Sequence, residues 1–344
     1  MDKRIDWVDY GKGIGIILVV YGHLLSSGYH AGLKIPEHFF ALSDSIVYSF
    51  HMPLFFFLSG LFVESSFRKR GARDYLVDKL ARIAYPYFLW SILQMSVEVI
   101  FSSQTQKGAS LSDILAIPYR PWGQFWFVYA LFLMHVAYTL LNKFGKYSMP
   151  MLFLVGFGLF FFPIQADIAA LTGFSTNFLF FVSGIFLGKY LLNKNVPILP
   201  LWVIMMLFAL LTGAGYFTFE NLITPTRLTD GSHPFYFLSL SILGIIACTS
   251  LAQYLSKKNL IQPLKTLGRY SLQIYLAHML AGAGTRMILA NVFHLQNWVL
   301  HITIGVLVAL AAPILLQKIS ERINFPYLFE FKWRRDKLPT NPLE

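Results

Sequence analysis

The chain has 344 residues, of which 56% are hydrophobic and 13% are charged, whereas about 25% of the residues of a soluble domain are charged. So large an apolar fraction cannot be hidden in one water-facing core, which excludes an ordinary soluble protein and predicts that most of the chain lies in lipid. The net charge of +11 does not indicate nucleic-acid binding, because the basic residues stand between apolar runs. We expect membrane lipids as partners and no nucleic acid.

Apolar stretches of roughly 17 to 25 residues follow one another along the chain and predict an all-α integral membrane protein, a bundle of about ten transmembrane helices. Prolines and other helix-stop residues occupy the breaks between them. We expect one transmembrane domain over residues 1–322 and a short basic cytoplasmic tail at residues 323–344. In chain order, the stretches are centred near Leu18, Phe55, Leu93, Leu131, Phe157, Phe181, Leu207, Leu243, Leu280 and Val306.

The Lys and Arg residues indicate the orientation of these spans. When the loops are assigned alternately to two sides, 23 of the 28 basic residues fall on one side and four on the other, and Arg286 lies inside a span. Cytoplasmic loops carry an excess of Lys and Arg. The asymmetry therefore predicts ten crossings with both chain ends in the cytoplasm.

Three residues of the first span form a polar stripe. Lys12 and His23 are 11 residues apart, about three helical turns, so they share one helix face at a separation of roughly 16 Å. Asp9 lies on the same face near the cytoplasmic end, where it can pair with Lys12. An imidazole, with a pKa of about 6.5, can take a proton from a hydroxyl group, and a lysine can hold phosphate groups. The alternative is that His23 only hydrogen-bonds a neighbouring helix.

Small residues recur in the apolar stretches. Gly11, Gly13 and Gly15 are not a dinucleotide fingerprint, because no strand precedes them, and they predict close helix packing or access of a ligand to the backbone. Residues 54–62 resemble residues 178–186, and both segments contain Ser-Gly among phenylalanines. We favour close backbone approach as the reason for this similarity; a duplicated half is the alternative.

Further polar or aromatic residues within or beside the spans are candidates for a site. His51 precedes Pro53, which can interrupt the helix and open backbone groups to a cavity. Lys79 and Arg82 stand where the third span leaves the cytoplasm, and they either contact phosphate or follow the positive-inside rule. Trp126 either belongs to an interfacial aromatic belt or stacks on a sugar ring.

The later spans carry His278 and Arg286, which are eight residues apart and about 80° apart around a helix, so both can face one cavity. Glu98 is expected in the same leaflet as Arg286 and is a plausible partner for it. The single cysteine, Cys248, excludes an internal disulfide, and no metal-ligand spacing is found. We therefore expect no metal.

Several segments together resemble membrane-bound acyltransferase family 3. They are Asp9-Tyr-Gly-Lys12-Gly, the ten residues between Lys12 and His23, and Phe50-His-Met-Pro-Leu-Phe-Phe-Phe-Leu-Ser-Gly60. The sequences of these segments are most similar to the branch described as fucose 4-O-acetylase and related acetyltransferases. Further matches are Lys79-Leu-Ala-Arg82, Phe125-Trp-Phe-Val-Tyr and Leu267-Gly-Arg-Tyr-Ser-Leu-Gln-Ile-Tyr-Leu-Ala-His278.

The resemblance implies a bacterial inner-membrane enzyme that transfers an acyl group, commonly acetyl from acetyl-CoA, to a hydroxyl of an extracytoplasmic or lipid-linked glycan. The family's basic residue and histidine fall on Lys12 and His23, with Lys where many relatives have Arg. We expect a catalytic group of His23, Lys12 and Asp9, phosphate contacts from Lys12, Lys79 and Arg82, and acceptor contacts from His51, Trp126, His278, Arg286 and Glu98.

A second hypothesis is a membrane transporter or exporter of a polysaccharide or its precursor, a role also assigned to some members of this family. Some relatives carry an additional extracytoplasmic domain that passes the acyl group on. This chain is expected to act on its acceptor directly or with a separate partner. The acceptor sugar, the acyl chain and the oligomeric state do not follow from the sequence.

Overall fold

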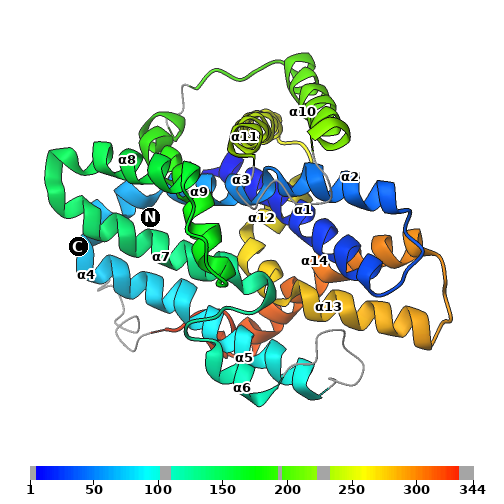
Figure 1. The fold of residues 1–344 in the computed structure, drawn as a ribbon. Helices are drawn as coiled ribbons and strands as arrows, with labels where there is room; N and C mark the ends of the chain where they lie inside the picture. The colour runs from blue at the N-terminus through cyan, green and yellow to red at the C-terminus, as the bar shows by residue number, and fades with distance from the viewer. Residues whose placement is uncertain (1–4, 101–109, 193–195, 223–232, 333–344) are drawn as a thin grey trace.

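The computed structural model describes residues 5–100, 110–192, 196–222 and 233–332. Within those ranges the chain forms helices and turns and no strand (Figure 1). The first half contains α1 (Asp6–His30), α2 (Glu37–Tyr48), α3 (His51–Gly60), α4 (Val63–Lys79), a π-helical turn η1 (Leu80–Ala84), α5 (Tyr85–Ile100), α6 (Leu111–Ala116), η3 (Gly123–Phe125), α7 (Trp126–Leu141), η4 (Asn142–Tyr147) and α8 (Ser148–Phe161). The second half contains α9 (Ala169–Leu191), α10 (Leu201–Leu222), α11 (Pro234–Lys258), α12 (Gln262–Arg269), α13 (Ser271–Asn291), α14 (Trp298–Arg322) and η6 (Pro326–Leu328).

The all-helical membrane architecture predicted from the sequence is confirmed. Every predicted span centre lies in a helix, and eight stretches of the described chain are long and apolar enough to cross a membrane. One of these, Gly123–Phe161, contains both α7 and α8, which are separated at Gly145, where φ is 59°. Helix α13 is not among the eight. Ten crossings and cytoplasmic chain ends therefore stay predictions.

Large apolar side chains on the outer surface indicate a lipid environment. Helix α10 lies at the edge of the bundle beside α11 (Figure 1), and its Trp202 and Met205 side chains are 64% and 58% exposed. A surface of this kind would be an aggregation hazard in water, whereas lipid chains are a favourable solvent for it.

Helix α1 is in the middle of the bundle and packs against α11, α12, α13 and α14. Its glycines make this possible. A Cβ at Gly13 would collide with the carbonyl oxygen of Leu264, and a Cβ at Gly268 of α12 would collide with the carbonyl oxygen of Asp9. The close helix packing predicted for the glycines of the first span is thus confirmed, and it brings α12 against the start of α1.

The two similar Phe-rich segments lie against each other. A Cβ at Gly60 of α3 would collide with the backbone of Phe181, and a Cβ at Gly184 of α9 would collide with the backbone of Phe57. The favoured interpretation, that Ser-Gly allows close backbone approach, is therefore confirmed. The alternative, a duplicated half, is not tested by this contact and stays open.

The helix interruption predicted near Pro53 falls between α2 and α3, at Ser49 and Phe50. Proline then occupies the first turn of α3, where its missing N–H costs nothing. Side chains donate to carbonyl groups at the break: the Ser241 hydroxyl donates to the Ser49 oxygen at 2.6 Å, and His51 Nδ1 donates to the Val47 oxygen at 2.6 Å. His51 is thereby fixed in the break.

The described part of the expected tail is packed on the bundle. Trp90 Nε1 donates to the Leu328 carbonyl oxygen at 2.8 Å, and the Tyr85 hydroxyl donates to the Tyr327 carbonyl oxygen at 2.8 Å. Phe329 is buried and stacks on Trp90 with the ring centroids 5.2 Å apart. Residues 323–332 therefore belong structurally to the helical domain.

Candidate active site

A half-buried histidine and a buried histidine from opposite ends of the sequence meet in the bundle. His23 Nδ1 of α1 lies 2.8 Å from His278 Nε2 of α13, although the two residues are 255 positions apart. The rings are nearly parallel, at an angle of 10°. Gly282, one turn after His278, lets α13 approach α1, because a Cβ there would contact Leu24 at 2.8 Å. The structure thus joins two residues that the sequence analysis named separately.

Backbone carbonyl groups determine which nitrogen of each histidine carries a proton. His278 Nδ1 lies 2.8 Å from the Tyr275 oxygen and 3.1 Å from the Ile274 oxygen. Because a carbonyl oxygen can only accept, His278 Nδ1 carries the hydrogen, and His278 Nε2 accepts from His23 Nδ1. Neutral His23 consequently has its lone pair on Nε2. This makes Nε2 of His23 a proton acceptor held in a fixed orientation.

Aromatic side chains surround the pair. The Tyr48 ring lies between His23 and His51, with centroid distances of 6.2 Å and 4.7 Å, so the structure brings His51 to this region. The Tyr275 ring is 5.9 Å from His278, and its hydroxyl donates to the Gln124 carbonyl oxygen. Tyr48 and Tyr275 were missed in the sequence; the signal for Tyr275 was its position one turn before His278.

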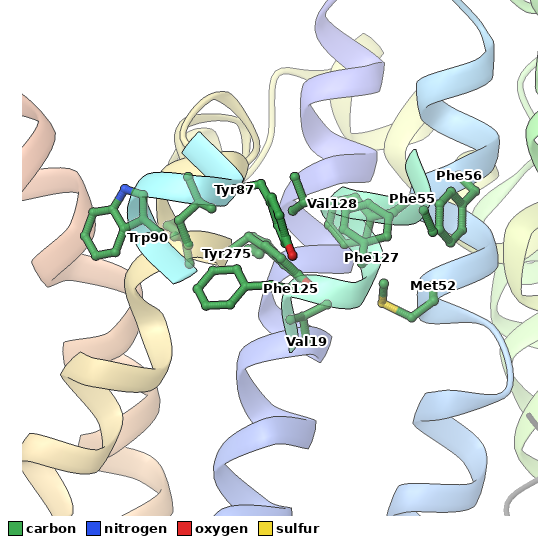
Figure 2. Close-up of a cluster of buried hydrophobic side chains, with 14 of the residues drawn as sticks. Val19, Met52, Phe55, Phe56, Tyr87, Trp90, Phe125, Phe127, Val128 and Tyr275 are labelled. Atoms are coloured by element: carbon green, nitrogen blue, oxygen red, sulfur yellow. The ribbon is translucent and has the colours of Figure 1, made fainter. Parts of the chain in front are cut away.

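The segment around η3 and the start of α7 contacts Tyr275, the neighbour of His278: Gln124 accepts from the Tyr275 hydroxyl, and the Phe127 ring lies 5.1 Å from the Tyr275 ring. Figure 2 shows Phe125, Phe127 and Tyr275 gathered beside α1, within a cluster of buried aromatic side chains. The Trp126 ring packs instead on α9, where a Cβ at Gly173 would collide with it. An acceptor contact from Trp126 stays a prediction.

The expected pairing of Glu98 with Arg286 is wrong. Glu98 accepts from Trp122 Nε1 at 2.9 Å, whereas Arg286 Nη1 donates to the Ser27 carbonyl oxygen at 2.8 Å and to its hydroxyl at 2.6 Å. The two residues therefore face different neighbours. Arg286 and His278 both contact α1, and Arg286 lines a separate small pocket that does not include His278.

Charged residues collect where α12 crosses the start of α1. Lys265 pairs with Asp6 at 2.5 Å, and Arg269 pairs with the buried Asp9 at 3.4 Å. Lys12 is half-buried on the next turn of α1. Among the described residues, three cations and two carboxylates thus gather at this end of α1. The sequence analysis did not single out Lys265 and Arg269, because their charge was assigned to membrane topology alone.

A second basic group surrounds Asp78 at the end of α4. Arg82 lies 3.0 Å, Lys79 3.5 Å and Arg70 3.8 Å from its carboxylate. The Lys79 side chain is only 18% exposed and lies over the Tyr75 ring, whereas the Arg82 side chain is 62% exposed. Arg82 is therefore the better placed of the two predicted phosphate contacts. Within the described ranges, no three His, Cys, Asp or Glu side chains come together as a metal site requires.

A family model and two curated relatives match this chain. A family model described as an acyltransferase domain matches residues 5–318. The nodulation protein NolL of Mesorhizobium japonicum is 27% identical over 175 residues, which is 49% of this chain and 44% of that protein. NolL of Sinorhizobium fredii is 24% identical over 227 residues, 62% of this chain and 59% of that protein. The chain thus matches about half the length of these curated relatives, and no solved structure matches it.

Proposed function

Since the chain belongs to acyltransferase family 3, we propose that this multi-pass membrane protein is an O-acyltransferase. It moves an acetyl or other acyl group from acyl-CoA to a hydroxyl of a cell-surface or lipid-linked glycan. The observation that carries the proposal is the hydrogen bond between His23 and His278, which leaves the lone pair of His23 on Nε2.

His23 is the general base of the proposed reaction. Its Nε2 takes the proton of the acceptor hydroxyl while the hydroxyl oxygen attacks the thioester carbonyl carbon. The tetrahedral intermediate then expels the thiolate of CoA, and the imidazolium returns the proton to that sulfur. The products are the ester and free CoA. His278 is a positioning residue, because it accepts the Nδ1 proton of His23 and stabilises the imidazolium without touching the substrate.

The donor is proposed to enter at the start of α1, which faces the cytoplasm in the orientation given by the basic residues. Lys12, Arg269 and Lys265 supply positive charge for the phosphates of acyl-CoA, and the exposed Arg82 is a further candidate. Roughly 16 Å of helix separates Lys12 from His23. The extended pantetheine arm of CoA suits this distance, since it carries the thioester away from the nucleotide.

The protein purified in detergent tests this proposal. It is incubated with radiolabelled acetyl-CoA and membrane glycans from a strain that lacks the gene, whose acceptor sites are unmodified. We expect an alkali-labile labelled ester together with free CoA thiol. Movement of glycan across vesicle membranes without consumption of acetyl-CoA would instead support the transporter hypothesis.

Replacing Lys12 by glutamine is expected to raise the KM for acetyl-CoA about tenfold with little change in kcat, because losing one charge-assisted hydrogen bond to phosphate costs about 1.5 kcal/mol. Lys12→Arg keeps the charge and should stay near wild type. Lys258→Gln is the matched control, since Lys258 is exposed near the end of α11. Initial rates at varied acetyl-CoA measure the effect; an unchanged KM in Lys12→Gln would remove Lys12 from the donor site.

A further inference from the structure

Arg286 is a cation inside the bundle with no carboxylate partner among the described residues. Its Nη1 is held by the carbonyl and hydroxyl oxygens of Ser27, and the side chain is half-buried on α13. Nε and Nη2 make no hydrogen bond to any described residue. A guanidinium among membrane helices is costly unless an anion or another acceptor compensates it. The side chain therefore has a fixed position and unused donors.

His301 of α14 lies in the wall of the same pocket and has an unused nitrogen. The residue is 3% exposed, and its Nε2 donates to the Leu295 carbonyl oxygen at 3.0 Å. Its Nδ1 is buried and has no hydrogen-bond partner. Leaving such an atom unpaired costs about 1–3 kcal/mol. Like the unused donors of Arg286, it points to a polar group missing from the pocket.

The pocket is small and lies close to the histidine pair. Its volume is about 20 Å³, enough for one water molecule or one ligand oxygen. Ser27, which holds Arg286, follows His23 by one turn of α1, a rise of about 6 Å. A group bound at Arg286 is therefore about one sugar residue away from the general base, at the end of α1 opposite Lys12.

We propose that this pocket anchors the phosphate of a lipid-linked sugar acceptor, an assignment that rests on the proposed function. One phosphate oxygen enters the pocket and accepts from Arg286, whose planar guanidinium suits two parallel hydrogen bonds to phosphate. The same group supplies the missing partner of His301 Nδ1. The contact needs a hydrogen between the phosphate oxygen and His301 Nδ1. A phosphate monoester supplies this hydrogen from its P–OH group. A diester has no P–OH group, so His301 carries the hydrogen in that case. The sugar then extends along α1 toward His23.

Thermal unfolding of the full-length protein in detergent tests the assignment with farnesyl phosphate, farnesol and inorganic phosphate as probes. We expect farnesyl phosphate alone to raise the melting temperature by a few degrees at saturation. Arg286→Gln should lose this shift. Arg286→Lys should bind about tenfold more weakly, because lysine cannot form two parallel hydrogen bonds. Arg322→Gln is the matched control, since Arg322 is exposed about 32 Å along α14 from His301.

An equal shift with farnesol, or an undiminished shift in Arg286→Gln, would contradict the proposal that this pocket binds phosphate through Arg286. An equal shift with inorganic phosphate would overturn the lipid-linked assignment. If Arg286→Gln does not fold, His301→Gln and Arg286→Lys test the proposal in its place, because the proposal requires both variants to bind farnesyl phosphate more weakly. The readout needs no acyl-CoA. If farnesyl phosphate does not raise the melting temperature of an active protein, only the phosphate-binding pocket is contradicted. If it raises the melting temperature of a protein that transfers no acyl group, only the enzymatic proposal is contradicted.

Discussion

Replacing His23 by glutamine should lower kcat for acyl transfer by about 10²–10⁴-fold, because glutamine cannot take the proton of the acceptor hydroxyl. The KM for acetyl-CoA should change little, since the proposed phosphate contacts lie about three turns away at the start of α1. Steady-state rates with the purified variant measure both values. His38→Gln is the matched control: its side chain is 64% exposed and its ion pair with Glu220 contributes little.

The coupling between His23 and His278 distinguishes a catalytic pair from two independent core residues. His278→Leu removes the acceptor that fixes the tautomer of His23 and should lower kcat about 10–100-fold, whereas His278→Gln retains an acceptor oxygen and should recover part of the loss. In a His23→Gln background, His278→Leu should cost nothing further, because residues that act as a unit are not additive. Additive losses would mean that His278 acts without His23.

Replacing Gly268 by alanine should destabilise the bundle by about 1–3 kcal/mol, the usual cost of overpacking. The added Cβ would collide with the carbonyl of Asp9 and lie 2.9 Å from the amide nitrogen of Gly13. Both are backbone atoms of α1, so α12 must move away and weaken the contact between Arg269 and Asp9. The clash outweighs the gain in helix propensity, which is about 1 kcal/mol.

Melting temperatures in detergent test this prediction. The control is Gly213→Ala on α10, where no atom lies within 4 Å of the added Cβ, so stability should stay the same or rise slightly. We also expect Gly268→Ala to raise the KM for acetyl-CoA through the displaced Arg269. If Gly268→Ala has the same melting temperature as the wild type, α12 can shift without a loss of stability.

Local periodicity was sufficient to predict the helices and the polar stripe of α1. Lys12 and His23 share a face because the spacing of 3.6 residues per turn requires it. Small residues also predicted contact correctly, since Gly13, Gly60 and Gly184 meet neighbouring backbones. The number of membrane crossings does not follow from periodicity alone, because α7 and α8 have only 16 and 14 residues.

Contacts between distant parts of the chain could not be read from the sequence. The partners of His23 and Asp9 lie on α13 and α12, and a single sequence does not say which helices become neighbours. The Glu98–Arg286 pairing failed for the same reason: the level of each residue in the membrane could be estimated, but the neighbour that it faces could not. Arg269 was overlooked because a basic loop residue has an adequate explanation in topology.

The measurement that tests the central claim most directly is acetyl transfer by purified wild-type protein and its His23→Gln variant. Both are given radiolabelled acetyl-CoA and unmodified membrane glycans, and labelled ester and CoA thiol are counted together. For the wild type we predict one CoA released per ester formed, and for a folded His23→Gln variant a loss of both by at least about 100-fold. Ester formation by that variant at the wild-type rate would contradict the account, because the proton acceptor would then lie elsewhere.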